Sequence, residues 1–317
     1  MTFVILLQAC PHELCNTLIQ SIPLKPKHSM KTILVPIDFS ENADKALAAA
    51  KQIAAKTGAK LLIMYAYQPY VGDFMIPESI VTAPIYQQLK DDYRTKLNER
   101  VSRAQQEGYL ADAIWETGSV ETAVLKQAKE NSADLIVVGR TGHAAFLDKL
   151  IGSAATGIAL QAHCPVLIIP PNNEVIRFDQ FVYATQLEFD EKEILLDVIA
   201  LTKQLKSKLR LVKVNSDEQL DIQPDGQYID EIEHELGIGR GEITILNSDH
   251  VMNRLEKYCG QIKADLLIVS NRRRGFLEKL LNPSMTKKLT MDTQVPLLVY
   301  HKESVKDGLK APMVILG

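Results

Sequence analysis

The sequence predicts an α/β protein made of two tandem, open, doubly wound domains, each with a five-stranded parallel sheet. Short continuous apolar segments alternate with longer segments that have helical periodicity, which is typical of a parallel sheet covered by helices on both faces. The second half of the chain repeats the strand pattern of the first. The length, 317 residues, is enough for two domains that each bury a core.

The repeat is clearest at two strands. Asp134-Leu-Ile-Val-Val-Gly139 recurs as Asp265-Leu-Leu-Ile-Val-Ser270, and Cys164-Pro-Val-Leu-Ile-Ile recurs as Val295-Pro-Leu-Leu-Val-Tyr, both at the same separation. The opening strands, at 32–37 and 181–185, lie farther apart, so the second half has a shorter segment between its second and fourth strands. We therefore expect domains at 30–171 and 172–317, joined near Pro170-Pro171.

The strands of the first half are expected at 32–37, 60–66, 112–116, 134–138 and 165–169. Right-handed crossovers between such strands favour an open doubly wound sheet. The helices lie between them. Ser40 is a plausible N-cap, and small apolar residues follow it at helical spacing until Gly58 ends the helix.

Further helices are expected at about 84–107, after Ser119 and after Gly152. Ser119 is a candidate N-cap, and the helical spacing places Val120, Val124 and Ala128 on the inward face.

Residues 1–29 do not fit the repeat. Thr2-Phe-Val-Ile-Leu-Leu is too short to span a bilayer, and no basic segment precedes it. Leu7-Gln-Ala-Cys10 is only weakly similar to a lipoprotein cleavage site. We expect residues 1–29 to be a disordered extension and a chain that begins at Met30 to fold.

Composition and charge limit the choice of function. The net charge is −3, with 46% hydrophobic and 24% charged residues, so no basic face is indicated for a nucleic acid or an anionic membrane. The four cysteines are scattered and predict neither a disulfide framework nor a zinc site. These features favour a cytoplasmic location.

The most informative segment is Gly139-Arg-Thr-Gly142, followed by nine residues and then Gly152-Ser153. It comes directly after a buried strand and leads into a helical segment. Glycines at the carboxyl end of a parallel strand let backbone N–H groups approach an anion, and a helix N-terminus adds partial positive charge. The alternative is a strand-to-helix turn that needs glycine only for its backbone angles.

This spacing resembles the motif G-x2-G-x9-G-[ST] of the universal stress protein (UspA) family in its ATP-binding form. The opening of that family also has a counterpart, Met30-Lys-Thr-Ile-Leu-Val-Pro-Ile-Asp38-Phe-Ser40. The resemblance implies a Rossmann-like sheet of order 3-2-1-4-5 that binds an adenine nucleotide, namely ATP with or without Mg²⁺. It also implies a lining of site residues, which are Pro36, Asp38, Ala66, Gly139, Gly142, Gly152 and Ser153.

The first and fourth strands are neighbours in that order, and a crevice opens at their carboxyl ends. Asp38 and Gly139 both fall there. The resemblance implies that Asp38 bonds the adenosine part beside the Ala66 backbone, while the glycines and the Ser153 hydroxyl surround the ribose and phosphates. Asp38 could instead be a helix-capping or turn carboxylate, and Ser153 could be an N-cap.

The second half departs from the motif at each corresponding position. Gln186 replaces Asp38, Ser270 replaces Gly139, Arg273 replaces Gly142, and Pro283 or Asn282 replaces Gly152. A side chain at a left-handed or closely approached position costs energy and occupies the space of a ligand. We therefore expect ATP in the first half only.

Other side chains give weaker indications. His143 could approach a phosphate but is expected to face solvent, and His163-Cys164 lacks partners at a catalytic spacing. Trp115 is expected in the core, and Tyr65, Tyr67 and Tyr70 either pack at a strand end or stack on a base.

Two function classes follow from this pattern. The first is a regulatory or stress-response protein whose nucleotide occupancy carries the signal. The second is a slow ATPase or phosphotransferase, although the motif lacks the Lys-Ser/Thr ending of a P-loop. We expect no catalytic residue and no resident metal ligand. The expected partners are an adenine nucleotide and the second domain, in an intramolecular pseudo-dimer, with a homodimer of the chain as a further option.

Overall fold

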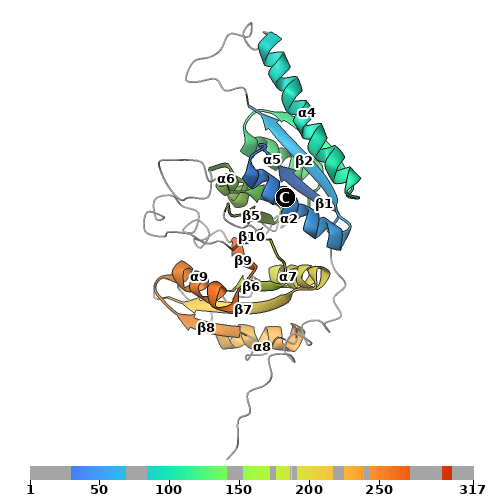
Figure 1. The fold of residues 1–317 in the computed structure, drawn as a ribbon. Helices are drawn as coiled ribbons and strands as arrows, with labels where there is room; N and C mark the ends of the chain where they lie inside the picture. The colour runs from blue at the N-terminus through green and yellow to red at the C-terminus, as the bar shows by residue number, and fades with distance from the viewer. Residues whose placement is uncertain are drawn as a thin grey trace, which may run out of the picture.

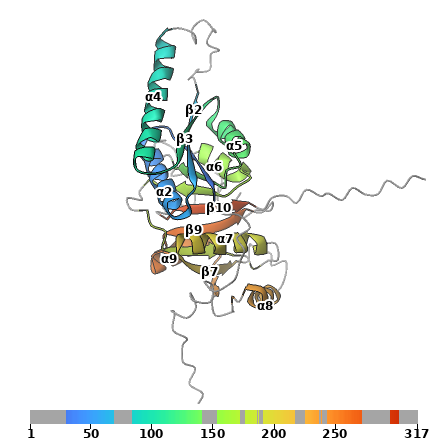
Figure 2. The same ribbon diagram turned by 90° about the vertical axis from the view of Figure 1, so that its right-hand side faces the viewer.

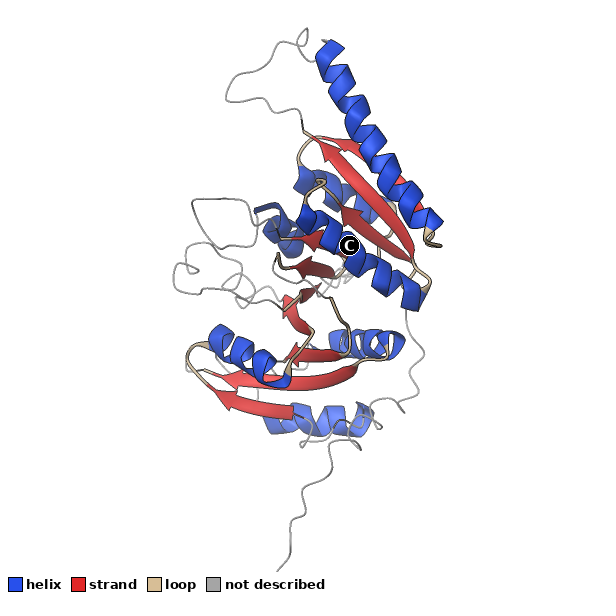
Figure 3. Cartoon of the chain, in the orientation of Figure 1, coloured by secondary structure: helices blue, strands red, loops and turns tan. Residues whose placement is uncertain are grey.

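The computed structural model describes residues 30–68, 84–140, 153–171, 176–185, 187, 191–216, 225–236, 238, 243–271 and 295–301. These residues form one ten-stranded sheet with the order β3-β2-β1-β4-β5-β10-β9-β6-β7-β8. Helices cover both faces of this sheet (Figures 1 and 3).

The first half contributes β1 to β5, all parallel to one another. Their bounds are Thr32–Pro36, Lys60–Tyr67, Ala111–Thr117, Leu135–Gly139 and Val166–Ile169. The helices between them are α2 (Glu41–Thr57), α4 (Pro84–Gln106), α5 (Val120–Glu130) and α6 (Ser153–Gln161). The expected strand order 3-2-1-4-5 is confirmed.

The second half repeats this topology with β6 to β10, in the order β8-β7-β6-β9-β10. The strands are Gln180–Ala184, Lys208–Asn215, Ile243–Asn247, Leu266–Asn271 and Leu297–His301. The helices are α7 (Lys192–Leu205), α8 (Asp225–Leu236) and α9 (Val251–Ile262). The expected shortening lies between β7 and β9, where α8 has 12 residues and its counterpart α4 has 23.

The two halves meet at β5 and β10, which pair antiparallel in the middle of the sheet. Leu167 lies opposite Leu298, and Val166 lies opposite Val299. All four side chains are buried. The edge strand that each half would expose on its own is thereby covered by the other half.

The cores on the two faces of the sheet each run through both halves. One contains residues of α2, α4, α7 and α8, and the other contains residues of α5, α6 and α9. Figure 2 shows α2 and α4 on one side of the first-half strands and α5 and α6 on the other. Helix α2 also contacts α7 directly, and the Lys56 ammonium donates to the carbonyl of Leu205 at 2.8 Å. The halves therefore share packing beyond the strand joint.

The helix termini follow the predicted signals. The Ser40 side chain accepts a hydrogen bond from the Ala43 N–H at 3.2 Å, and Gly58 ends α2 with a φ of 74°. Ser119 caps α5 by accepting from the Thr122 N–H. The inward assignment of Val120 is wrong.

Val120 is 36% exposed, whereas Val124 and Ala128 are buried as predicted. Because Val120 is the first residue of α5, it lies where the helix has only begun to cover the sheet, and Ala123 provides the buried contact of that turn instead.

A repeated aspartate ties the first and fourth strands of each half together at their amino ends. The Asp134 carboxylate accepts from the backbone N–H groups of Lys31 and Thr32 at 2.7 and 2.9 Å. Asp265 does the same with Asp179 and Gln180 at 3.1 and 2.9 Å. The repeat noticed in the sequence is therefore explained at this position by strand pairing, not by a ligand.

Candidate functional site

The crevice predicted between the first and fourth strands begins with the pairing of β1 and β4. Ile33 lies opposite Leu135 and Leu34 opposite Ile136, so continuing the register brings Gly139 level with Ile37. Pro36 is buried as the last residue of β1, and Asp38 follows at the exposed carboxyl edge. The structure thus brings together Pro36, Asp38 and Gly139 as the sequence predicted.

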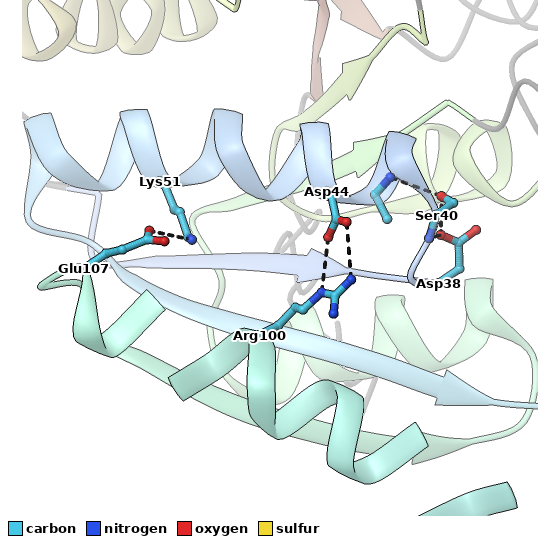
Figure 4. Close-up of polar contacts among 7 residues, drawn as sticks. Asp38, Ser40, Asp44, Lys51, Arg100 and Glu107 are labelled. Carbon is cyan, nitrogen blue, oxygen red and sulfur yellow. Dashed lines mark hydrogen bonds and ion pairs between the residues drawn. The ribbon is translucent and has the colours of Figure 1, made fainter. Parts of the chain in front are cut away.

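Asp38 organises the turn that leads into α2. Its Oδ1 atom accepts hydrogen bonds from the Ser40 N–H at 3.0 Å and from the Ser40 hydroxyl at 2.5 Å (Figure 4). Asp38 therefore has the role of a turn carboxylate, which the sequence left open as an alternative. Within the described part of the chain, Oδ2 accepts no hydrogen bond, so one oxygen of an exposed carboxylate is available to a hydroxyl or amine donor.

Phe39 is held in a left-handed conformation, with a φ of 63°. This conformation is unusual for a bulky residue and has to be offset by packing. The Phe39 ring stacks on Tyr93 of α4 with 5.8 Å between centroids and tilts against Tyr65 at 4.8 Å. Sequence reasoning missed Phe39, because a left-handed phenylalanine has no local signal.

The Ala66 backbone lies next to an aromatic cluster formed by Phe39, Tyr65, Tyr67, Tyr93 and Trp115. Tyr65 stacks on Tyr93 at 5.1 Å and contacts Trp115 at 5.4 Å. Burial, together with nearby Tyr93, Tyr67 and Asp38, raises the pKa of Tyr65 to about 12. Of the two interpretations of Tyr65 and Tyr67, the structure favours strand-end packing, and Tyr70 lies outside the described residues.

Ion pairs hold α4 on this cluster and against α2. The Arg100 guanidinium lies 3.3 Å from the Asp44 carboxylate, and the Lys51 ammonium lies 2.7 Å from Glu107 (Figure 4). Arg100 also lies over the Phe39 ring, and Arg94 lies 4.9 Å from the centre of Trp115. Helix α4, which packs on this aromatic cluster, is therefore held in place by charged residues at its surface.

Gly139 is required for a reason that the sequence did not reveal. Its φ is not in the left-handed region; instead, a Cβ atom there would lie 2.4 Å from the Asn42 carbonyl oxygen and 2.7 Å from the Asn42 carbonyl carbon. Glycine at this position permits the first turn of α2 to pack against the end of β4. Close helix packing is thus a sufficient reason for glycine at position 139, and the approach of a ligand there stays a prediction.

The remaining motif residues are described only in part. Gly142, His143 and Gly152 lie outside the described residues. Ser153 is the first residue of α6, so its backbone stands at a helix N-terminus. Its role as an N-cap or as a phosphate ligand stays a prediction. In the second half, Gln186, Arg273, Asn282 and Pro283 also lie outside the described residues.

The corresponding position of the second half contains a buried polar network. Glu191, fully buried just before α7, accepts a hydrogen bond from the Thr185 hydroxyl at 2.5 Å and another from the Ser270 hydroxyl at 3.4 Å. Thr185 follows β6, Ser270 lies on β9, and these strands correspond to β1 and β4. Lys213 of β7 is also buried, at 3% exposure.

Leu187 repeats the left-handed conformation of Phe39, with a φ of 56°. The main-chain path after the first strand of each half is therefore similar. In the second half, however, the buried Glu191 carboxylate fills the space at the ends of β6 and β9. Sequence reasoning identified Ser270 as a departure from the motif but missed Glu191.

Cysteine and metal chemistry receive no support from the described residues. Burial raises the pKa of the Cys164 thiol to about 12 and that of Cys259 to about 12, and neither forms a disulfide. In the described ranges, no three His, Cys, Asp or Glu side chains are grouped so that they could hold a metal ion. The helices found there are also too short or too polar to cross a bilayer.

The described residues form a doubly wound, Rossmann-like α/β fold that brings the exposed Asp38 carboxylate and Gly139 to its switch point. The model of the universal stress protein family matches residues 30–170. A universal stress protein from Thermus aquaticus, from the 3′ region of QAH/OAS sulfhydrylase, is 32% identical over 148 residues, which cover 44% of this chain and 98% of the relative. The chain belongs to the universal stress protein family.

One further relative agrees with this assignment, and one solved structure shares the fold. Universal stress protein A homolog 1 from Coxiella burnetii is 31% identical over 143 residues, covering 44% of this chain and 95% of the relative. The crystal structure of a universal stress protein from Archaeoglobus fulgidus has a TM-score of 0.67 at 18% identity, and covers 87% of this chain and 98% of that one. The first two relatives match less than half of this chain, whereas the solved structure shares its fold across both halves.

Proposed function

We propose that this protein is an ATP-binding regulator of the stress response that holds one nucleotide in its first half. The observation that carries the proposal is the meeting of Asp38 and Gly139 at the carboxyl ends of β1 and β4, where the motif Gly139-x2-Gly142-x9-Gly152-Ser153 begins. This switch point is where doubly wound sheets bind ligands. We place domain boundaries at 30–171 and 172–317.

The free Oδ2 atom of Asp38 suits a ribose hydroxyl or an adenine amine, because both can donate to a carboxylate. In our proposal, the Ala66 backbone lies beside the base, and Pro36 lines the floor. The phosphates contact the segments around Gly142, Gly152 and Ser153, where backbone N–H groups and the N-terminus of α6 favour negative charge. Any Mg²⁺ would accompany the nucleotide through its phosphate oxygens.

The second half is proposed to bind no nucleotide. Ser270 and Glu191 fill the strand ends where the first half has Gly139 and Ala43, and the carboxylate of Asp38 has no counterpart in the sequence, since Gln186 replaces it. We infer that this half serves instead as the fixed second member of an intramolecular pseudo-dimer, joined through β5 and β10. A homodimer of the whole chain remains a second level of assembly, and we place the protein in the cytoplasm.

Two measurements test the proposal. Chromatography of the nucleotide released by denaturing gently purified protein should identify ATP, and titration calorimetry should give one ATP per chain. Gly142→Arg, which copies Arg273, should raise the dissociation constant for ATP by about tenfold or more, while Arg273→Gly, as the matched control, leaves it unchanged. Two equivalent sites, or an unaffected Gly142→Arg protein, would contradict the proposal.

The alternative is a slow ATPase or phosphotransferase. Hydrolysis needs groups that clamp the phosphates and orient water, and Asp38 lies at the adenosine end of the proposed site. Steady-state ATP hydrolysis at about 1 per second or faster, the range of most enzymes, would favour this alternative if Asp38→Ala or Ser153→Ala abolished it. We expect slower turnover, if there is any, because binding is the functional event in our proposal.

A further inference from the structure

The entrance to the glycine motif is held on two sides by hydrogen bonds to one residue, Arg140. Its backbone N–H donates to the Ile169 carbonyl at the end of β5 at 2.8 Å. Its carbonyl oxygen accepts a hydrogen bond from the Asn42 side-chain amide at 2.9 Å. Asn42 lies in the first turn of α2, 98 positions earlier in the chain, so the start of this loop is fixed by two separate elements.

The same asparagine contacts the residue before Arg140. The Asn42 carbonyl group occupies the space beside Gly139, and a Cβ atom at Gly139 would lie only 2.4 Å from its oxygen. The Asn42 side chain thus donates to Arg140, and the Asn42 backbone packs against Gly139. Together these contacts leave the last residue of β4 and the first residue of the loop little freedom to move relative to α2.

The described residues of the second half show a different contact at the corresponding strand end. Its helix α7 begins at Lys192, whereas α2 begins at Glu41, directly after the N-cap that follows the shared left-handed residue. Ser270 has a side chain where Gly139 has none, and its hydroxyl bonds Glu191 instead. Within the described residues, the helix-to-strand contact formed by Asn42 is therefore seen in the half that retains the glycine motif.

We propose that Asn42 is a positioning residue for the nucleotide site, because it holds Gly139 and Arg140, the residues from which the glycine motif continues to the proposed phosphate end. This inference rests on the proposed binding of ATP in the first half. Asn42 acts through Arg140 and Gly139 and need not touch the nucleotide. Its loss should affect ATP, whose phosphates contact the loop, more than adenosine, which has none.

Titration calorimetry with ATP and with adenosine tests this inference on the full chain. Asn42→Ala and Asn42→Asp should each raise the dissociation constant for ATP by about tenfold and leave that for adenosine within about twofold of the parent value. Asn42→Asp retains the shape of the side chain, and an acidic residue in the first turn favours the helix, so α2 should remain folded. Asn98→Ala, an exposed asparagine of α4, is the matched control and should behave as the parent does.

The outcomes separate the two proposals. A parent protein that binds no ATP would refute the proposed function itself. If the parent binds ATP and both Asn42 variants bind it equally well, only the role of Asn42 is refuted. An equal loss of ATP and adenosine affinity would also overturn the inference, because it would indicate a general disturbance of α2 and no specific effect on the phosphate end.

Discussion

At the scale of single residues, the structure gives a physical reason for glycine at position 139 that the sequence did not reveal. Gly139 was expected for its backbone angles or for the approach of a ligand. Its backbone is not left-handed, and it lets α2 pack against β4, since Asn42 occupies the place of its side chain; the approach of a ligand stays a prediction. A nucleotide that binds near Gly139 would not have to order the end of β4 and the start of α2, because these are already held together.

Gly139→Ser, which copies Ser270, should lower the free energy of unfolding by about 1–3 kcal/mol, because the new Cβ atom forces the first turn of α2 away from β4. Denaturant unfolding measures the change. Gly260→Ser is the control, because nothing lies within 4 Å of a Cβ atom there, and its stability should remain equal or rise slightly. Equal behaviour of the two variants would show that the contact with Asn42 is easily relieved.

A second expectation at this scale concerns Cys164 and Cys259. Because burial raises the pKa of each thiol to about 12, almost no thiolate forms at pH 8. Iodoacetamide should therefore leave both unmodified in the folded protein and modify both after denaturation, as read by peptide mass spectrometry. Modification of Cys164 at the same rate before and after denaturation would mean that the folded protein exposes it.

At the scale of elements, each half joins its first and fourth strands at both ends. The amino ends are joined by Asp134 and by Asp265, in the same way. The carboxyl ends are joined differently, by the helix turn at Asn42 in one half and by the Glu191 carboxylate in the other. Both halves thus have side-chain contacts at the carboxyl ends of these strands, but the contacts involve different chemical groups.

Glu191→Ala should lower the free energy of unfolding by about 2–4 kcal/mol, because it leaves the buried hydroxyls of Thr185 and Ser270 without this acceptor and opens a cavity. Urea denaturation gives the value. Glu193→Ala removes an exposed carboxylate two residues away and should change it by less than about 0.5 kcal/mol. The buried network would be energetically unimportant if the two variants were equally stable.

Elements that depend on local pattern could be predicted from the sequence, and contacts between distant elements could not. The strands were recognisable because burial on both faces makes them continuously apolar, as in Leu135–Gly139, and Ser40 and Ser119 marked helix starts. Val120 was misplaced because periodicity does not tell where a helix begins to cover the sheet. Asn42 and Glu191 were missed because their partners lie up to 98 positions away, and no spacing indicates such a pair.

At the scale of the whole molecule, the joint between β5 and β10 makes the two halves parts of one sheet. Since both strands belong to one chain, the association does not depend on meeting a second molecule. The thermal midpoint should therefore stay constant when the protein concentration changes by about a hundredfold, as measured by fluorescence or circular dichroism. A midpoint that rises with concentration would indicate that stability requires a second copy of the chain.

The direction of the strands has a consequence for valency. Strands run parallel within each half and antiparallel across the joint, so the carboxyl ends of the two halves point to opposite edges of the sheet. A symmetric pair of binding subunits would present a nucleotide at both edges and could crosslink two partners. Here the second edge is occupied by Glu191 and its hydroxyl donors. With a nucleotide in the first half only, as we propose, a partner that recognises it would find one attachment point, and its assembly with this chain would stop at one to one.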